Sequence, residues 1–120
     1  MPPQTKTNSI PWSTFNKNNY RGQLLVWHED NHQFSGTISE INVRPGHGIE
    51  VSLKEIEVRE KIDDPWRDSS CPVRSIHFNA SREPINDELG VSIGHGGNNT
   101  ATIIPVRNRD DLQKVLLQQQ

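Results

Sequence analysis

The segment from Phe34 to Val58 constrains the fold of this chain more than any other part of its sequence. Two runs of alternating apolar residues flank the turn sequence Arg-Pro-Gly-His-Gly at positions 44–48. Alternation with a period of two is typical of β-strands, and a Gly- and Pro-rich turn between two such runs is typical of a hairpin. The segment therefore predicts a long antiparallel hairpin that places Val43 opposite Ile49 and Phe34 opposite Val58.

The apolar positions of this hairpin change phase once in each strand. They fall at 34, 36 and 38 and then at 41 and 43 in the first strand, and at 49, 51 and 53 and then at 56 and 58 in the second. Because successive side chains of a strand point to opposite faces, the change requires a β-bulge or a switch of buried face. We favour bulges, which would bend the hairpin. A switch would leave an apolar patch at the hairpin tip.

Further apolar patterns predict four more strands and one helix. The strands are expected at 22–27, 73–78, 89–93 and 100–106, the first of them buried on both faces. Asn108 is a good helix N-cap, and Leu112, Val115 and Leu116 follow at helical spacing.

The chain is thus expected to be mainly β. It would form a small antiparallel barrel or strongly bent sheet of about six strands in hairpins, with one C-terminal helix packed on it. The alternative is an α+β fold with an open antiparallel sheet.

This order of elements over residues 20–118 resembles that of pleckstrin-homology-like domains. The resemblance lies in the arrangement of the elements, without a shared motif. Lipid-binding members of that class use basic residues around the first hairpin turn, whereas the corresponding turn here, His-Glu-Asp-Asn-His at 28–32, is acidic. It would repel a phosphoinositide head group, so the resemblance implies contacts with protein rather than lipid.

The length of 120 residues suits one domain, which we place at 20–120 behind an N-terminal tail of residues 1–19. Several large apolar residues interrupt this polar tail, and such residues seldom stay exposed. We expect them to hold the tail across the domain and cover an open sheet edge; a partner-binding segment is the alternative. These residues are Ile10, Trp12, Phe15 and Tyr20.

Charge and cysteine content limit the partners and the compartment. There are 13 basic and 15 acidic residues, so no concentrated basic field favours nucleic acid through counterion release. A β-barrel that stacks single-stranded nucleic acid on Trp12, Tyr20 or Trp66 nevertheless remains an alternative. With one cysteine, Cys71, and no apolar run of membrane-spanning length, we expect a cytoplasmic protein that does not enter a membrane.

Residues 28–32 match the metalloprotease pattern H-E-x-x-H literally. That chemistry needs both histidines on one face of a helix, one turn apart. Here the pattern follows an expected strand, and its centre, Asp30-Asn31, favours a turn. We therefore expect no metal site. Approach of His28 and His32 around a tight turn, with adventitious metal binding, is the weaker alternative.

No catalytic set emerges from the sequence. Cys71 and His77 would lie on the same face of an extended segment, but six residues of strand span about 20 Å, beyond hydrogen-bond reach. A small enzyme with a polar site built from His77, Asp64, Asp68 or Cys71 is the first alternative to a binding function.

The leading hypothesis is a non-catalytic interaction domain that needs no cofactor. It would bind a protein or peptide, or pair with itself as a homo-oligomer, through an exposed strand edge or an aromatic loop. Trp66, an aromatic residue on a charged loop, is a binding candidate, unless it caps the open end of the barrel. The other candidates are the phase-shifted residues of the hairpin tip, Ile41, Val43, Ile49 and Val51.

Overall fold

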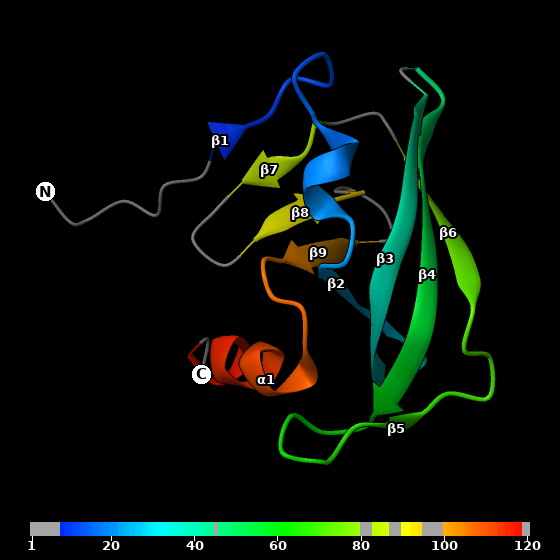
Figure 1. Cartoon of the computed structure of the whole chain (residues 1–120), viewed down its shortest axis with the longest axis vertical. Helices are drawn as coiled ribbons and strands as arrows, with labels where there is room; N and C mark the ends of the chain where they lie inside the picture. The colour runs from blue at the N-terminus through cyan, green and yellow to red at the C-terminus, as the bar shows by residue number, and fades with distance from the viewer. Residues whose placement is uncertain (1–7, 45, 80–82, 87–89, 95–99, 119–120) are drawn as a thin grey trace, which may run out of the picture.

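The computed structural model describes residues 8–44, 46–79, 83–86, 90–94 and 100–118 (Figure 1). In these ranges the chain forms a nine-stranded antiparallel sheet, a short 3₁₀ helix and one α-helix. The strands are β1 (Asn8–Ser9), β2 (Leu24–Glu29), β3 (His32–Arg44), β4 (Gly48–Arg59), β5 (Arg67–Asp68), β6 (Arg74–Phe78), β7 (Ile85–Asn86), β8 (Val91–Ile93) and β9 (Ala101–Ile104). The helices are η1 (Lys17–Tyr20) and α1 (Arg109–Gln118).

The prediction of a mainly β fold with a C-terminal helix is confirmed. The six longer strands, β2, β3, β4, β6, β8 and β9, fall where the apolar patterns predict strands. The other three have two residues each, too few to show alternation. The strand order is β1-β7-β8-β9-β2-β3-β4-β5, and β6 also pairs with β4, so the sheet is bent but open rather than a closed barrel.

The phase changes in the long hairpin are two β-bulges of opposite sense. Val43 pairs with Ile49 and Phe34 with Val58, as predicted, but Ile38 between them pairs with Leu53. One extra residue on β4 displaces the register near Glu55, which has a left-handed φ of 53°, and one extra residue on β3 restores it. Two compensating bulges therefore bend the ribbon without changing its overall register.

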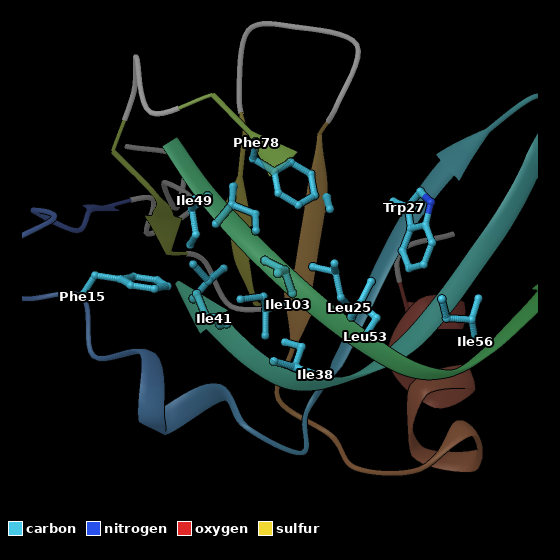
Figure 2. Close-up of a cluster of buried hydrophobic side chains, with 14 residues drawn as sticks. Phe15, Leu25, Trp27, Ile38, Ile41, Ile49, Leu53, Ile56, Phe78 and Ile103 are labelled. Carbon is cyan, nitrogen blue, oxygen red and sulfur yellow. The ribbon is translucent and has the colours of Figure 1, made fainter. Parts of the chain in front are cut away.

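The bulges keep both halves of the hairpin facing a single core. Ile41, Ile49 and Val51 lie in the same buried cluster as Ile38 and Leu53 (Figure 2). The cluster also receives Leu25, Ile103 and Phe78 from other strands. The bulge prediction is thus confirmed, and the alternative switch of face is wrong, because each bulge offsets the side-chain alternation by one residue.

Strand β2 is buried on both faces, as its continuous apolar sequence predicts. Leu25 and Trp27 belong to the larger core, whereas Leu24 and Val26 belong to a second cluster under α1. Helix α1 contributes Leu112, which is fully buried, and Leu116, which is 5% exposed, to that second cluster. The helix therefore covers the face of the sheet opposite to the larger core.

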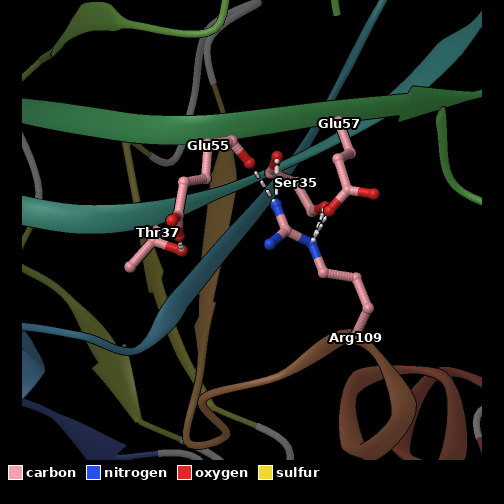
Figure 3. A network of polar contacts seen from close by, with 5 residues as sticks. All are labelled: Ser35, Thr37, Glu55, Glu57 and Arg109. Carbon is pink, nitrogen blue, oxygen red and sulfur yellow. Dashed lines mark hydrogen bonds and ion pairs between the residues drawn. The ribbon is translucent and has the colours of Figure 1, made fainter. Parts of the chain in front are cut away.

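Polar contacts fix the start of α1 on the bulged hairpin. The Asn108 side chain accepts a hydrogen bond from the Asp111 N–H at 2.8 Å, so Asn108 is the expected N-cap. Arg109 donates to the carbonyl oxygen of Glu55 at 2.6 Å and pairs with Glu57 at 3.0 Å (Figure 3). Burial lowers the pKa of Arg109, and the charges of Glu57 and Glu55 partly offset this.

Leu116→Ala should destabilise the protein by about 2–4 kcal/mol, because it removes buried apolar atoms from the helix–sheet contact. Leu117→Ala is the matched control, since Leu117 is 50% exposed and should change stability by less than about 0.5 kcal/mol. Urea denaturation followed by circular dichroism measures both. Equal effects of the two substitutions would contradict the docking of α1 through Leu116.

The described part of the N-terminal segment lies against the sheet. β1 pairs with β7, and the Ile10 N–H donates to the carbonyl oxygen of Pro84 at 2.8 Å. Phe15 is buried in the larger core and stacks on Tyr20, with 5.0 Å between the ring centroids. This packing agrees with a segment held across the domain, where its aromatic residues cover one end of the core.

Candidate functional site

An open cleft runs beside β6, the strand that lies next to β4 on the side of the molecule away from α1 (Figure 1). We call it the edge cleft. Its volume is about 570 Å³, which lies in the range of about 300–1,000 Å³ typical of ligand sites. One wall is formed by β6, and the opposite wall by Trp27, His28, Glu29, Asp30 and Thr100.

All five residues of β6, 74–78, line the edge cleft. Because side chains alternate between the faces of a strand, a cavity under one face would contact every second residue. Contact with five consecutive residues means that the cleft follows the strand's open edge. In the described part of the chain β6 pairs with β4 alone, so no other strand occupies this edge.

The backbone alternation assigns the groups that point into the cleft. The carbonyl oxygen of Ser52 on β4 accepts a hydrogen bond from the Ser39 hydroxyl, so it points toward β3 and away from β6. Ser52 and its pairing partner on β6, Ser75, therefore do not share backbone hydrogen bonds. The carbonyl oxygen of Pro72, just before β6, accepts from the Ile56 N–H on β4. Residues 74, 76 and 78 therefore face β4, and the N–H and C=O groups of Ser75 and His77 face the open side.

Apolar side chains form part of the inner side of the cleft. Burial alternates along β6, with Ile76 half-buried and Phe78 only 1% exposed. Trp27 is 5% exposed and stacks on Phe34, with 5.4 Å between the ring centroids. The floor of the cleft is thus partly apolar, and Ile76 is its most accessible apolar side chain.

Charged residues mark one end of the cleft. Arg74 and Glu29 form an ion pair across it, with an N–O distance of 2.9 Å. Asp30 lies beside them at an exposed left-handed turn position, with a φ of 52°, and no ion pair to its carboxylate is found within the described ranges. Two carboxylates and one guanidinium leave this end with net negative charge.

The opposite end of β6 is fixed by contacts on its outer face. His77 donates through Nε2 to the carbonyl oxygen of His47 at 3.0 Å. Gly48 lies under this contact with a φ of +119°, and a Cβ at that position would overlap the Phe78 carbonyl oxygen. The close approach of β6 to the hairpin tip therefore requires glycine at this position.

Three of the predicted interface residues do not form a surface. Ile41, Ile49 and Val51 are each at most 1% exposed and lie in the larger core. The predicted apolar patch at the hairpin tip is therefore wrong for these residues. The bulges turn their side chains inward, into the same cluster as Phe15 and Phe78.

The other two predicted interface residues, Val43 and Trp66, are half-buried. Val43 borders a shallow hollow of about 430 Å³ together with Trp12. Trp66 packs on the cluster under α1, and the Arg59 guanidinium lies 4.2 Å from its ring centroid. Trp66 and Val43 are on different parts of the molecule and belong to neither wall of the edge cleft.

The guanidinium of Arg59 is part of a buried polar contact with the helix. It donates to the side chains of Gln33 at 2.6 Å and Gln113 at 2.5 Å. Burial lowers the pKa of Arg59, and the charges of Asp64 and Asp63 partly offset this. Trp66 thus forms part of the packing around Arg59, which suits the capping alternative for this residue.

The H-E-x-x-H pattern lies on a hairpin rather than on a helix. His28 pairs with Gln33 and Glu29 pairs with His32, so the two histidines are on opposite faces of the sheet. His32 donates through Nδ1 to the carbonyl oxygen of Asp30 at 2.6 Å. The two imidazoles cannot share a metal ion, and in the described residues no group of three potential metal ligands is found.

The proposed polar enzyme site is not assembled. Asp68 pairs with Glu57 and His77 with Glu50, seven positions apart on β4, which is roughly 20 Å. Cys71 is exposed on the connection between β5 and β6. The structure therefore does not bring Asp68 and His77 within hydrogen-bond reach of each other.

The aromatic residues considered for nucleic-acid stacking do not share a surface. Trp12 and Tyr20 pack around Phe15 at one end of the larger core. Trp66 packs on the other side of the sheet under α1.

Among the described residues, no helix is long and apolar enough to cross a membrane.

In comparisons with protein-family models, curated proteins and solved structures, nothing matched this chain. The function is therefore inferred from the geometry of the molecule. The residues of the edge cleft, Trp27, Glu29, Asp30, Arg74 and Ile76, are absent from the sequence-based candidates. Glu29 and Asp30 lie in the acidic turn at 28–32, for which the resemblance implied contacts with protein. For the other three residues the only signal was the general expectation of an exposed strand edge, which did not identify the strand.

Proposed function

We propose that this protein is a non-catalytic interaction domain that binds an extended segment of a protein or peptide along the open edge of β6. The observation that carries the proposal is the contact of five consecutive β6 residues with one open cleft. An extended chain placed there would complete the hydrogen bonds of Ser75 and His77, as in β-strand addition. The half-buried Ile76 would gain a cover at the same time.

The size and charge of the cleft also support binding rather than chemistry. It holds an ion pair, Arg74 with Glu29, but no pair of a nucleophile and a base at hydrogen-bond distance among the described residues. Main-chain hydrogen bonds would supply affinity, and the apolar floor would supply selectivity. Such an interaction needs no cofactor.

Blocking the edge should weaken binding without unfolding the protein. Peptides selected from a random heptapeptide phage library against the full chain would be synthesised and titrated by isothermal titration calorimetry. Ser75→Pro removes an N–H that faces the cleft and should weaken binding by at least about tenfold, because proline is tolerated at edges but cannot donate. Ser75→Ala keeps the N–H and should stay within about twofold.

A second measurement leaves the protein unchanged. Methylation of the peptide amides that face β6 should abolish binding, whereas methylation of the alternate amides should be tolerated. Retention of full affinity by Ser75→Pro, or equal effects of both methylation patterns, would contradict strand addition at β6.

A further inference from the structure

We propose that the occupant of the edge cleft is an extended peptide with a bulky apolar residue two positions before a lysine or arginine. This inference rests on the proposed function and adds the chemistry of the partner. It follows from the half-buried Ile76 on the cleft floor, the open backbone groups of Ser75 and His77 and the negative charge near Asp30.

The apolar residue follows from the position of Ile76. A strand added to β6 would lie about 4.8 Å away, with its side chains alternating in step with those of β6. The side chain opposite Ile76 would then point inward over the cleft floor, which contains Trp27 and Phe78. An apolar side chain gains affinity there by leaving water, and a polar side chain does not.

The open backbone groups of β6 indicate a peptide rather than a purely apolar ligand. The N–H and C=O groups of Ser75 and His77 face the open side of the strand. An extended chain supplies an acceptor and a donor to each of these residues, whereas a purely apolar ligand supplies neither.

The basic residue follows from the charge at the Arg74 end. Glu29 is already paired with Arg74, and Asp30 is exposed and without an ion pair in the described ranges. In an antiparallel strand the next inward-facing residue after the apolar one lies opposite Arg74, whose charge Glu29 already neutralises, at the end of the cleft that carries the Asp30 carboxylate. Lysine or arginine is attracted there, whereas an acidic or phosphorylated residue is repelled.

The walls of the cleft favour a single extended chain over a second copy of this protein. β6 forms one wall, and Trp27 to Asp30 with Thr100 forms the other. The edge strand of a second folded copy would bring its own sheet against the turn at Asp30. A peptide without neighbouring strands avoids that collision.

Capped heptapeptides test the pattern directly. The reference sequence is Ser-Thr-Ser-Leu-Ser-Lys-Ser, and fluorescence polarisation of labelled peptides measures binding to the full chain. Replacing its leucine with serine should weaken binding by at least about tenfold. Replacing its lysine with glutamate should weaken binding by about fivefold, as expected for an exposed charge pair.

The variant Asp30→Asn separates the charge effect from the fold. Asparagine tolerates the left-handed conformation at this position, so the turn is retained while the charge is lost. The preference for lysine over glutamate should fall to about twofold or less. An unchanged preference would overturn the assignment of the basic residue to this end of the cleft.

Three results would overturn the inference in distinguishable ways. If library peptides bind, lose affinity for Ser75→Pro and lack the apolar-x-basic pattern, the inference is wrong and the proposed function stands. If no peptide is found whose binding Ser75→Pro weakens, both are wrong. Sedimentation of the wild type as a dimer that Ser75→Pro dissociates would show that a second copy is the occupant.

Discussion

Val51→Lys is expected to unfold the protein. Val51 is fully buried, between Ile41 on β3 and Ile76 on β6. A lysine there must either bury its ammonium group without a partner or force the strands apart. The cost should exceed about 4 kcal/mol, a large part of the roughly 5–15 kcal/mol that stabilises a typical domain. Circular dichroism and urea denaturation would detect the loss.

Glu50→Lys is the matched control for this substitution. Glu50 is the adjacent residue on β4, and its side chain is exposed. Its replacement should change stability by less than about 0.5 kcal/mol. A folded Val51→Lys variant that differed from the wild type only in oligomeric state would contradict the burial of this residue and restore the hairpin tip as an interface.

Gly48→Ala should destabilise the protein by about 2–6 kcal/mol. The residue has a φ of +119°, and its Cβ would meet the Phe78 carbonyl oxygen and the His77 ring. Backbone strain and forced displacement of β6 each contribute about 1–3 kcal/mol. Because β6 would shift, the affinity for an edge-binding peptide should fall as well.

Gly46→Ala in the same turn isolates the steric part of this effect. Gly46 has a φ of +84°, and nothing lies within 4 Å of the position of its Cβ. Its substitution should cost only the left-handed strain, about 1–2 kcal/mol. Equal melting temperatures for the two alanine variants would contradict the close approach of β6 to Gly48.

The residues of the edge cleft carry no pattern in the sequence that sets them apart. Ile76 and Arg74 look like ordinary residues of an alternating strand, and Trp27 looks like the end of a buried one. Their place in the cleft depends on the bend of the sheet, which brings the end of β2 opposite the open edge of β6. Pairing partners far apart in the sequence decide which edge stays open, and alternation within a strand carries no information about them.

The hairpin tip illustrates a related difficulty. The phase changes at Ile38–Ile41 and Leu53–Ile56 correctly indicated either bulges or exposed apolar residues. A local pattern cannot separate these outcomes, because both satisfy the alternation of side chains. Only the pairing of Ile38 with Leu53 shows that the two bulges compensate and that both halves share one core.

The sequence by itself determined the local structure. Alternation fixed five of the six longer strands, and a continuous apolar run fixed β2. Asp30-Asn31 fixed the tight turn between β2 and β3, and Asn108 with Leu112 and Leu116 fixed the start and the buried face of α1. Each depends on neighbours within one turn or one strand, so short-range propensities suffice. The tertiary structure alone decided that the sheet stays open, that Val51 is core and that β6 pairs with β4 alone in the described part of the chain. Those outcomes depend on contacts between segments that are distant in the sequence. The free energy of such contacts cannot be inferred from the pattern of either segment alone.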